Sequence, residues 1–296
     1  MPRLLPTKLW QVLGAAATAV ALKGCATGTG SMAEGPVLRG TEPVQATSDS
    51  VPTDFRYAPG PAGSYRYYRL DSIEYRFPGA SQVQVYGRTA YLTVGIEPRD
   101  SAYRVEFQLD SIFQDPGTTH QPALDSLGRV RWVAEMDPAG GLRNFSVSPA
   151  SPFGENLSIE LARRFFPVQP AGGVRAGVVW TDSAEVTVGG VSLNQTERSV
   201  TRSAATMTDD SLGIRIESSA VLERRGTSTQ TGEVIEAAGS GVDSTAFFLG
   251  PDGLFLGGEG KEQLDLLFTI PAVGQDVPVQ QVSHYRIARI PLPAER

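Results

Sequence analysis

Regular alternation of apolar and polar side chains is the feature that most limits how this chain can fold. Tyr103, Val105, Phe107 and Leu109 are each followed by a polar residue. A period of two places successive side chains on opposite faces of a strand, so the run predicts a β-strand with one buried face and one wet face. A similar alternation begins at residue 212 and predicts a second strand of this kind.

Two stretches have the composition of hairpin turns. A strand predicted over residues 129–136, which contains Trp132, is followed by Asp137-Pro138-Ala139-Gly140-Gly141 and by a short apolar strand at 142–147. Residues 244–249 and 254–256 flank the second stretch, Gly250-Pro251-Asp252-Gly253. Both contain the Pro and Gly that tight turns require, so each predicts an antiparallel hairpin.

These hairpins suggest an internal duplication with halves at residues 65–150 and 175–292. In each half, long alternating strands precede a short hairpin, so residues 103–113 would correspond to residues 212–224. The likeness is one of pattern rather than residue identity. The alternative is that hairpins of an all-β chain resemble each other by chance.

One helix is predicted between the halves, over residues 154–166. Leu157, Leu161 and Phe165 are four residues apart and form one apolar stripe, and Pro167 ends the segment. We expect this helix to pack on a sheet face. The predicted fold is therefore mainly β: a long, curved antiparallel sheet, as an open half-barrel or flattened barrel, with one prominent central helix. A β-sandwich is the alternative.

The first residues have the pattern of an export signal. Arg3 and Lys8 precede an apolar run at residues 9–22, which is shorter than the ~20 residues that span a bilayer. The segment Leu22-Lys23-Gly24-Cys25 resembles the lipobox of bacterial lipoprotein precursors, although that family prefers a small or apolar residue where Lys23 stands. The resemblance implies cleavage before Cys25 and a lipid on its sulfur. The alternative is an ordinary signal peptide or N-terminal anchor with an incidental cysteine.

The chain then divides into three parts: a signal peptide at 1–24, a lipidated cysteine and flexible tether at 25–64, and a β-rich domain at 65–296. The tether is inferred from its Gly, Pro, Ser and Thr content. We expect an exported protein held on a membrane. By resemblance to known sorting signals, Ala26 favours the outer membrane, facing the periplasm, with the cell surface as the alternative.

The charge of the chain limits its partners. The formal charge is −6, and removal of the three cations within residues 1–24 makes it −9. An acidic chain is a poor partner for nucleic acid, which rewards clustered Lys and Arg. For the same reason, an acidic chain is poorly suited to electrostatic binding to anionic lipid. We expect the lipid at Cys25 to provide the contact with the membrane.

The residues give little sign of catalysis or of a cofactor. His120 and His284 are the only histidines, no pair has metal-ligand spacing, and no Gly-x-Ser-x-Gly motif occurs. The run at residues 257–261 is not a phosphate loop, because Phe255 occupies the first glycine position and Glu262 replaces the Ser or Thr. We expect no metal, no cofactor and no enzymatic activity, although a Ser-His-Asp set could still assemble from distant positions.

Aromatic residues are the candidates for contact with a ligand or partner. The run from residue 65 to 77 mixes tyrosines with arginines and could stack on a sugar or another ring. Its plainer interpretation is an amphipathic strand with one face in the core and Arg at the surface. The candidate contact residues are Tyr65, Tyr67, Tyr68, Trp132 and Trp180.

A second resemblance rests on Phe166-Pro167-Val168-Gln169-Pro170 followed by Gly177-Val178-Val179-Trp180. A proline-containing segment that leads into a Gly-x-x-Trp strand start resembles an uncharacterised family of β-rich bacterial envelope lipoproteins, over residues 65 to 292. That family has no known catalytic residue to transfer. We expect Trp180 to close the start of a strand.

Three functions remain open. The first is a non-catalytic binding module for an apolar or lipid-like ligand, which predicts a large apolar pocket between sheet and helix. The alternative is a structural or protein-interaction lipoprotein of the envelope, which predicts an exposed apolar or aromatic patch. The third is a hydrolase-type enzyme, which predicts a polar cleft with perturbed acids or a histidine.

Overall fold

The computed structural model describes residues 56–290 except 122–123, 125–128, 151–156, 158–159, 163, 171, 176, 189–191, 207–212, 231–232 and 251–252. Within strands, the side chains of 61, 182–188, 192–206, 228–230 and 233 are also outside the description. The signal peptide, Cys25 and the tether up to residue 55 therefore lie outside the described residues. No helix in the described ranges is long and apolar enough to cross a membrane.

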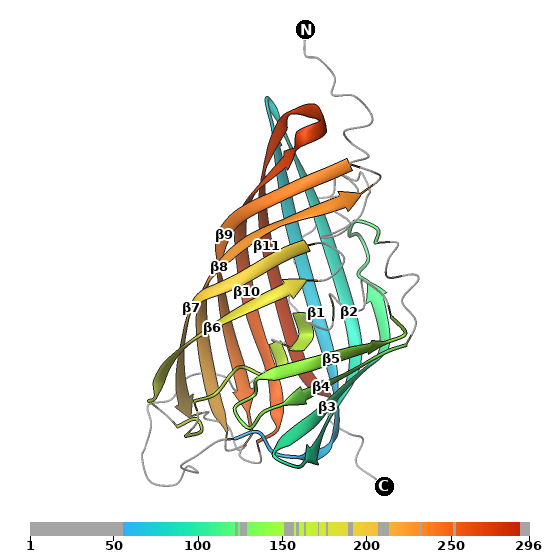
Figure 1. Ribbon diagram of the computed structural model, residues 1–296. Helices are drawn as coiled ribbons and strands as arrows, with labels where there is room; N and C mark the ends of the chain where they lie inside the picture. The colour runs from blue at the N-terminus through green and yellow to red at the C-terminus, as the bar shows by residue number, and fades with distance from the viewer. Residues whose placement is uncertain are drawn as a thin grey trace.

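The described chain forms one antiparallel sheet of eleven strands in the order β5-β4-β3-β2-β1-β11-β10-β9-β8-β7-β6 (Figure 1). The first and last strands pair at the middle of this order, and β5 and β6 are its two edges. One sheet rather than two rules out the alternative β-sandwich. The strands are β1 (Gly60–Phe77), β2 (Ala80–Arg99), β3 (Ala102–Gln114), β4 (Val130–Met136), β5 (Leu142–Ser148), β6 (Val179–Val188), β7 (Ser192–Thr206), β8 (Ile214–Gln230), β9 (Glu233–Leu249), β10 (Phe255–Ile270) and β11 (Gln275–Ile290), with a 3-10 turn, η1 (Pro271–Val273), before β11.

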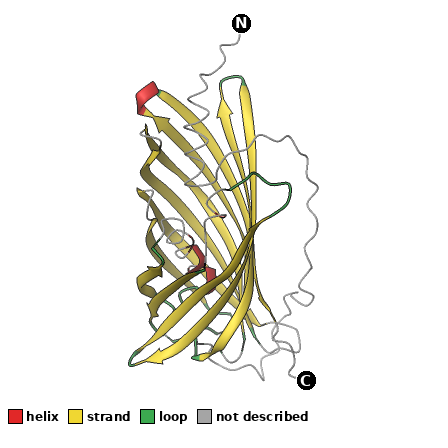
Figure 2. Ribbon diagram, turned by 90° about the vertical axis from the view of Figure 1, so that its right-hand side faces the viewer, coloured by secondary structure: helices red, strands yellow, loops and turns green. Residues whose placement is uncertain are grey.

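The sheet is strongly curved, and both of its ends curl toward the same side (Figures 1 and 2). We call this side the inner face and the opposite side the outer face. Glycines of β9 permit close approach to β10. A Cβ atom at Gly239 would lie 2.1 Å from the carbonyl oxygen of Asp265, and one at Gly241 would lie 2.0 Å from that of Gln263. Any other residue would push the two strands apart there.

Alternation decides which side chains of β1 point inward. Tyr65, Tyr67 and Ile73 are buried, as the amphipathic-strand interpretation predicts. Arg69 shares their face and is only 6% exposed, so the expectation that the arginines of this run lie at the surface was wrong for this residue. A strand places every second residue on one face whatever its charge, and nearby acids compensate Arg69.

The central helix is less extensive than predicted. Among the described residues of this segment, helical conformation occurs at 157, 160–162, 164 and 165, so the prediction of a prominent helix was wrong. The predicted stripe is confirmed, because Leu157, Leu161 and Phe165 are at most 2% exposed. A short helix suffices because the sheet curls around it and buries much of its own inner face (Figure 2).

The inner face carries two apolar clusters. The first, which we call the lower core, centres on Phe165, whose ring lies 5.5 Å from Phe107, 5.1 Å from Tyr65 and 4.9 Å from Phe255, centroid to centroid. The second, the upper core, consists of strand residues alone. Its members are Ile73, Tyr75, Phe77, Tyr86, Ala220, Leu222, Ile235, Ala237, Leu264, Leu266, Phe268, Ile270, Val277 and Val279.

Both predicted hairpins are confirmed. Between β4 and β5, Asp137 Oδ1 accepts hydrogen bonds from the backbone N–H groups of Ala139 (2.8 Å) and Gly141 (2.9 Å). Between β9 and β10, the N–H of Gly253 donates to Gly250 O at 3.0 Å.

The internal duplication stays a prediction. The fold includes residues that we assigned to the tether, because Tyr57 is buried and its hydroxyl donates to Pro167 O at 2.7 Å.

The close approach at β9 predicts the effect of adding one methyl group. We expect Gly241→Ala to lower the free energy of unfolding by about 2 kcal/mol or more, because the new Cβ overlaps the backbone of β10. Urea denaturation of the purified protein measures the change. Gly95→Ala on β2 is the matched control, because its Cβ would find only Ala62 Cβ at 3.7 Å. Equal stability of the two variants would contradict this account of the curvature.

Candidate functional site

The structure separates the predicted contact residues. Tyr65, Tyr67 and Trp132 lie on the inner face and are at most 4% exposed. Trp180 stands at the start of β6, as expected, and its indole N–H donates to Val168 O at 3.0 Å. Tyr68 is 37% exposed and lies on the outer face. Tyr68 is the most exposed of the five, since Trp180 is partly buried.

Charged residues lie between the two apolar clusters of the inner face. Arg69 of β1 places its Nε 2.7 Å from Asp71 Oδ1 and its Nη1 2.8 Å from Glu160 Oε1 of the helix. Arg88 of β2 places its Nη2 2.9 Å from Glu160 Oε2. We call the full set the inner ion cluster. It comprises Arg69, Asp71, Arg88, Glu160, Arg164, Arg224 and Glu262.

Glu262 of β10 is the second acid that joins distant elements in the inner ion cluster. Arg224 of β8 lies 3.0 Å from one of its oxygens, and Arg164 of the helix lies 3.8 Å from the other. The guanidinium of Arg164 also lies 3.5 Å from the ring centroid of Tyr285, a cation–π contact. The cluster thus ties the helix to strands on both sides of the β1–β11 pair.

The electrostatics of the cluster favour ionised groups. Burial opposes ionisation of Glu160, but Arg69, Arg88 and Arg164 outweigh it and hold the pKa of Glu160 well below its usual range. Burial, together with the charge of Glu160, raises the pKa of Tyr67. Tyr67 therefore keeps its proton and donates it in a hydrogen bond to Glu160. The arrangement suits docking of the helix better than proton transfer.

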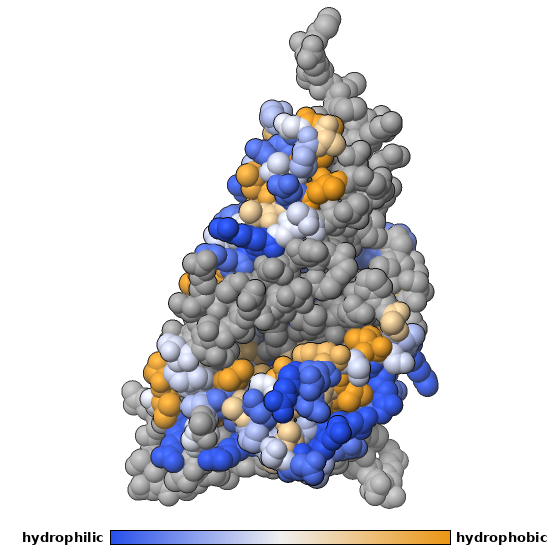
Figure 3. Space-filling view, viewed as in Figure 1, coloured by the Kyte–Doolittle hydropathy of each residue, from blue (hydrophilic) through white to orange (hydrophobic). Residues whose placement is uncertain are grey.

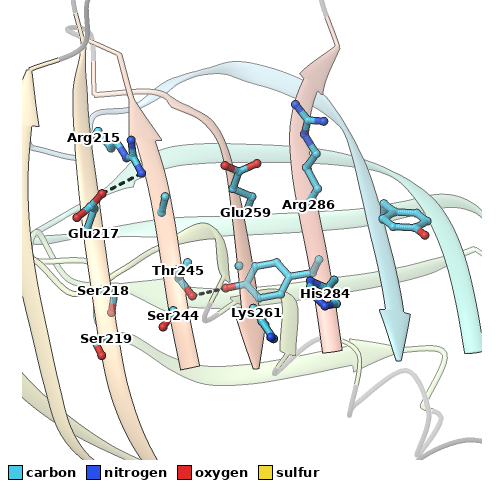
Figure 4. Close-up of a pocket in the computed structure, with 14 residues that line it drawn as sticks. Arg215, Glu217, Ser218, Ser219, Ser244, Thr245, Glu259, Lys261, His284 and Arg286 are labelled. Carbon is cyan, nitrogen blue, oxygen red and sulfur yellow. Dashed lines mark hydrogen bonds and ion pairs between the residues drawn. The ribbon is translucent and has the colours of Figure 1, made fainter. Parts of the chain in front are cut away.

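A groove of about 880 Å³ lies on the opposite side of the same strands (Figure 4). Outward-facing side chains of β8 to β11, together with Tyr68 of β1, line it. We call it the outer groove. Its outward-facing members are Tyr68, Arg215, Glu217, Ser219, Ser244, Ala246, Glu259, Lys261, His284 and Arg286.

The floor of the outer groove is tied to the inner face. The Tyr285 ring lies across β10 at Gly260, where a Cβ would come within 2.5 Å of it. The Tyr285 hydroxyl is hydrogen-bonded to Thr245 (Figure 4). Burial raises the pKa of Tyr285 to about 12, so the phenol stays protonated. Since Arg164 packs on the same ring, the inner ion cluster supports the floor from behind.

Lys261 is the distinctive residue of the outer groove. It is the only lysine after Lys23 in the whole sequence, which otherwise uses arginine as its cation. It is directly paired with His284 on β11 and with Ser244 on β9, and Ser244 is paired with Ser219 on β8. This row therefore contains a cation, an imidazole and two hydroxyls, and no acid. Lys261 has no ion pair within the described ranges.

Three exposed aromatic rings extend this surface across β1, β2 and β3. Tyr91 and Phe113 are 37% and 58% exposed, and their ring centroids lie 6.4 Å apart in an edge-to-face arrangement. Tyr68 and Phe113 are both paired with Thr89, so all three rings are neighbours on the outer face. We call them the aromatic trio. They adjoin the outer groove, which Tyr68 also lines.

Sequence reasoning missed Phe113 because of a bulge. Tyr91 is paired with Ser111 and Leu92 with Leu109, so Asp110 is an extra residue in β3. An extra residue reverses the faces beyond it. Phe113 has the same odd numbering as Val105 and Leu109, but it points outward while they point inward. Only the pairing with β2 reveals this change.

In the view of Figure 3, hydrophilic and hydrophobic residues are interspersed over the described part of the face that is shown. No three His, Cys, Asp or Glu side chains within the described ranges gather as metal ligands.

Comparisons with known proteins give little guidance. No protein family matches the sequence, and no curated protein matches it. Among solved structures, two mutants of the Rh. blastica porin are similar at 9% identity and TM-scores of 0.23 and 0.25, covering 77% and 76% of this chain and 99% of theirs. A structure described as "Asymmetric conductivity of engineered proteins" is similar at 8% identity and a TM-score of 0.23, with 77% and 99% covered. Likenesses this distant support no argument.

The inner ion cluster predicts a large and pH-dependent effect at Glu160. We expect Glu160→Gln to lower the free energy of unfolding by about 3 kcal/mol at neutral pH, because it leaves buried arginines without their acid. Because folding depresses the pKa of Glu160, its stabilisation is present above the ordinary glutamate pKa of about 4.3 and is lost as pH falls below it. The difference between wild type and variant should therefore shrink in acid.

Denaturant unfolding between pH 7 and pH 3 measures both effects. Glu97→Gln is the matched control, because the Glu97 side chain is 68% exposed in its pair with Arg104 and should cost less than about 1 kcal/mol. A Glu160→Gln variant as stable as this control at pH 7 would show that the cluster does not hold the helix.

Proposed function

We propose that this protein is an exported envelope lipoprotein whose domain is a non-catalytic binding module, and that the module binds through its outer face. The observation that carries the proposal is the continuous surface made by the aromatic trio and the outer groove. Exposed aromatic rings beside a groove of paired polar side chains supply both contact area and directional hydrogen bonds.

The location of the binding surface follows from what each face offers. The expectation of an apolar ligand requires space between sheet and helix, and Leu161 and Phe165 fill the lower core with no exposed area. A ligand there would have to displace the helix against the inner ion cluster. A partner on the outer face needs no such displacement. We therefore place binding at the outer face and keep the apolar ligand as the alternative.

The proposed anchor is the lipid at Cys25. Its support is the resemblance of Leu22-Lys23-Gly24-Cys25 to a lipobox. Several acyl chains on one residue give a stable anchor, whereas a single chain gives a marginal one. We propose the outer membrane, facing the periplasm, as the location, with the cell surface as the alternative.

We expect Cys25→Ser to abolish incorporation of an alkyne-tagged fatty acid and to move the protein from the membrane fraction to the soluble fraction. Click labelling of immunoprecipitated protein and fractionation of lysed cells measure the two effects. Lys23→Ala is the control and should retain both label and membrane association. A Cys25→Ser variant that keeps the fatty-acid label would contradict lipidation at this residue.

The binding surface is tested by photo-cross-linking in the native host. The photoreactive amino acid p-benzoylphenylalanine inserts into C–H bonds of any neighbour, so it reports proteins, glycans and lipids alike. We expect adducts when it replaces Phe113 or Tyr68, at several times the yield from Val83. Val83 is the matched control, because it is 56% exposed on the same strand as Tyr91. Equal yields at the three positions would exclude a specific surface at the aromatic trio.

A further inference from the structure

We infer that the outer face binds a linear glycan that carries carboxylate groups, with its chain lying across the strands and one carboxylate on Lys261. This inference rests on the proposed binding role of the outer face and adds the chemical class of the ligand. Three observations carry it: the kinds of side chain present, their arrangement in rows, and the position of Lys261.

The side chains of the outer groove fit a hydroxyl-rich ligand better than a protein partner. Protein interface cores are depleted in Lys, Glu and Ser, yet Lys261, Glu259 and Ser244 stand together on adjacent strands at the centre of the groove. A sugar offers many hydroxyls, each both donor and acceptor, which match acids, cations and serines together. The exposed rings of the aromatic trio complement the C–H faces of sugar rings.

The sheet pairing aligns these groups in a row that crosses the strands. Phe113, Thr89 and Tyr68 are successive partners across β3, β2 and β1, and Arg286, Glu259 and Ala246 continue the row across β11, β10 and β9. Neighbouring strands lie roughly 4.8 Å apart, which is close to the length of one pyranose unit. A linear glycan laid along the row would meet a new strand with about each sugar.

The second row of side chains indicates that the ligand carries an acidic group. His284, Lys261 and Ser244 are successive partners beside the first row, and no acid stands among them. In Figure 4, Lys261 and His284 extend from neighbouring strands on the side of the groove away from Glu259. A charge-assisted hydrogen bond to a carboxylate there is about twice as strong as a neutral one. Because the protein is acidic as a whole, an anion would need local cations, and Lys261 is one that has no ion pair within the described ranges.

The test compares two probes that differ only in charge: cellohexaose, and the same hexasaccharide oxidised to carboxylate at C6. The full mature protein, purified in detergent, is titrated with each probe by calorimetry at physiological salt. We expect the oxidised hexamer to bind about tenfold more tightly than the neutral one. Lys261→Gln should remove that difference, and Phe113→Ala should weaken both probes. Arg76→Gln, a cation on the outer face of β1 that is outside the groove, should change neither.

Lys261, the only lysine after Lys23, gives a second readout. An N-hydroxysuccinimide ester should modify Lys261 alone on the mature, N-acylated protein, and saturating oxidised hexamer should slow this modification about tenfold. Equal binding of the two hexamers, with no protection of Lys261, would overturn the acidic class. If neither hexamer binds while photo-cross-links at Phe113 join a protein, the glycan inference fails and the proposed function stands. If those cross-links are absent too, both fail.

Discussion

The pairing of β1 with β11 is the constraint on which the rest of this structure depends. It joins the first and last strands at the middle of the sheet, and it places Arg69 beside Tyr285 on the inner face and Tyr68 beside Arg286 on the outer face. The inner ion cluster and the outer groove are therefore two sides of the same few strands. A shift of one residue in this register would exchange the two faces of β11 relative to β1, so it would dismantle both sites at once.

We expect charge burial on the inner face to contribute more to specificity than to net stability. Taking ions out of water is costly, and an apolar cluster of the same shape would often be as stable. Here the carboxylate of Glu160 has three guanidinium partners from two strands and its own helix. Apolar side chains would let the short helix slide along the curled sheet, whereas Glu160 fixes one position. Through Arg164 on Tyr285, that fixed position also sets the floor of the outer groove.

Local patterns predicted several of the strands, both hairpins and the buried stripe of the helix, because alternation and Pro/Gly turns act within a few residues. The features that define the candidate site are non-local. Arg69 was assigned to the surface because its compensating acids, Glu160 and Glu262, come from distant parts of the chain. Phe113 was hidden by a bulge that is visible only against β2. Lys261 lies in a glycine-rich run that does not match a phosphate loop, and only the strand pairing brings it beside His284 and Ser244.

Pairing strands from the two ends of a chain slows folding. Ser64 finds its partner in Ile290, so the central pair of the sheet cannot form until nearly the whole polypeptide is present. Contacts between residues so distant in sequence close slowly, because the loop entropy is lost before the contact stabilises the chain. The β1–β2 hairpin can form early, because Phe77 is paired with Ala80 across a short turn. The other edge of β1 stays open until β11, the last strand, has been made.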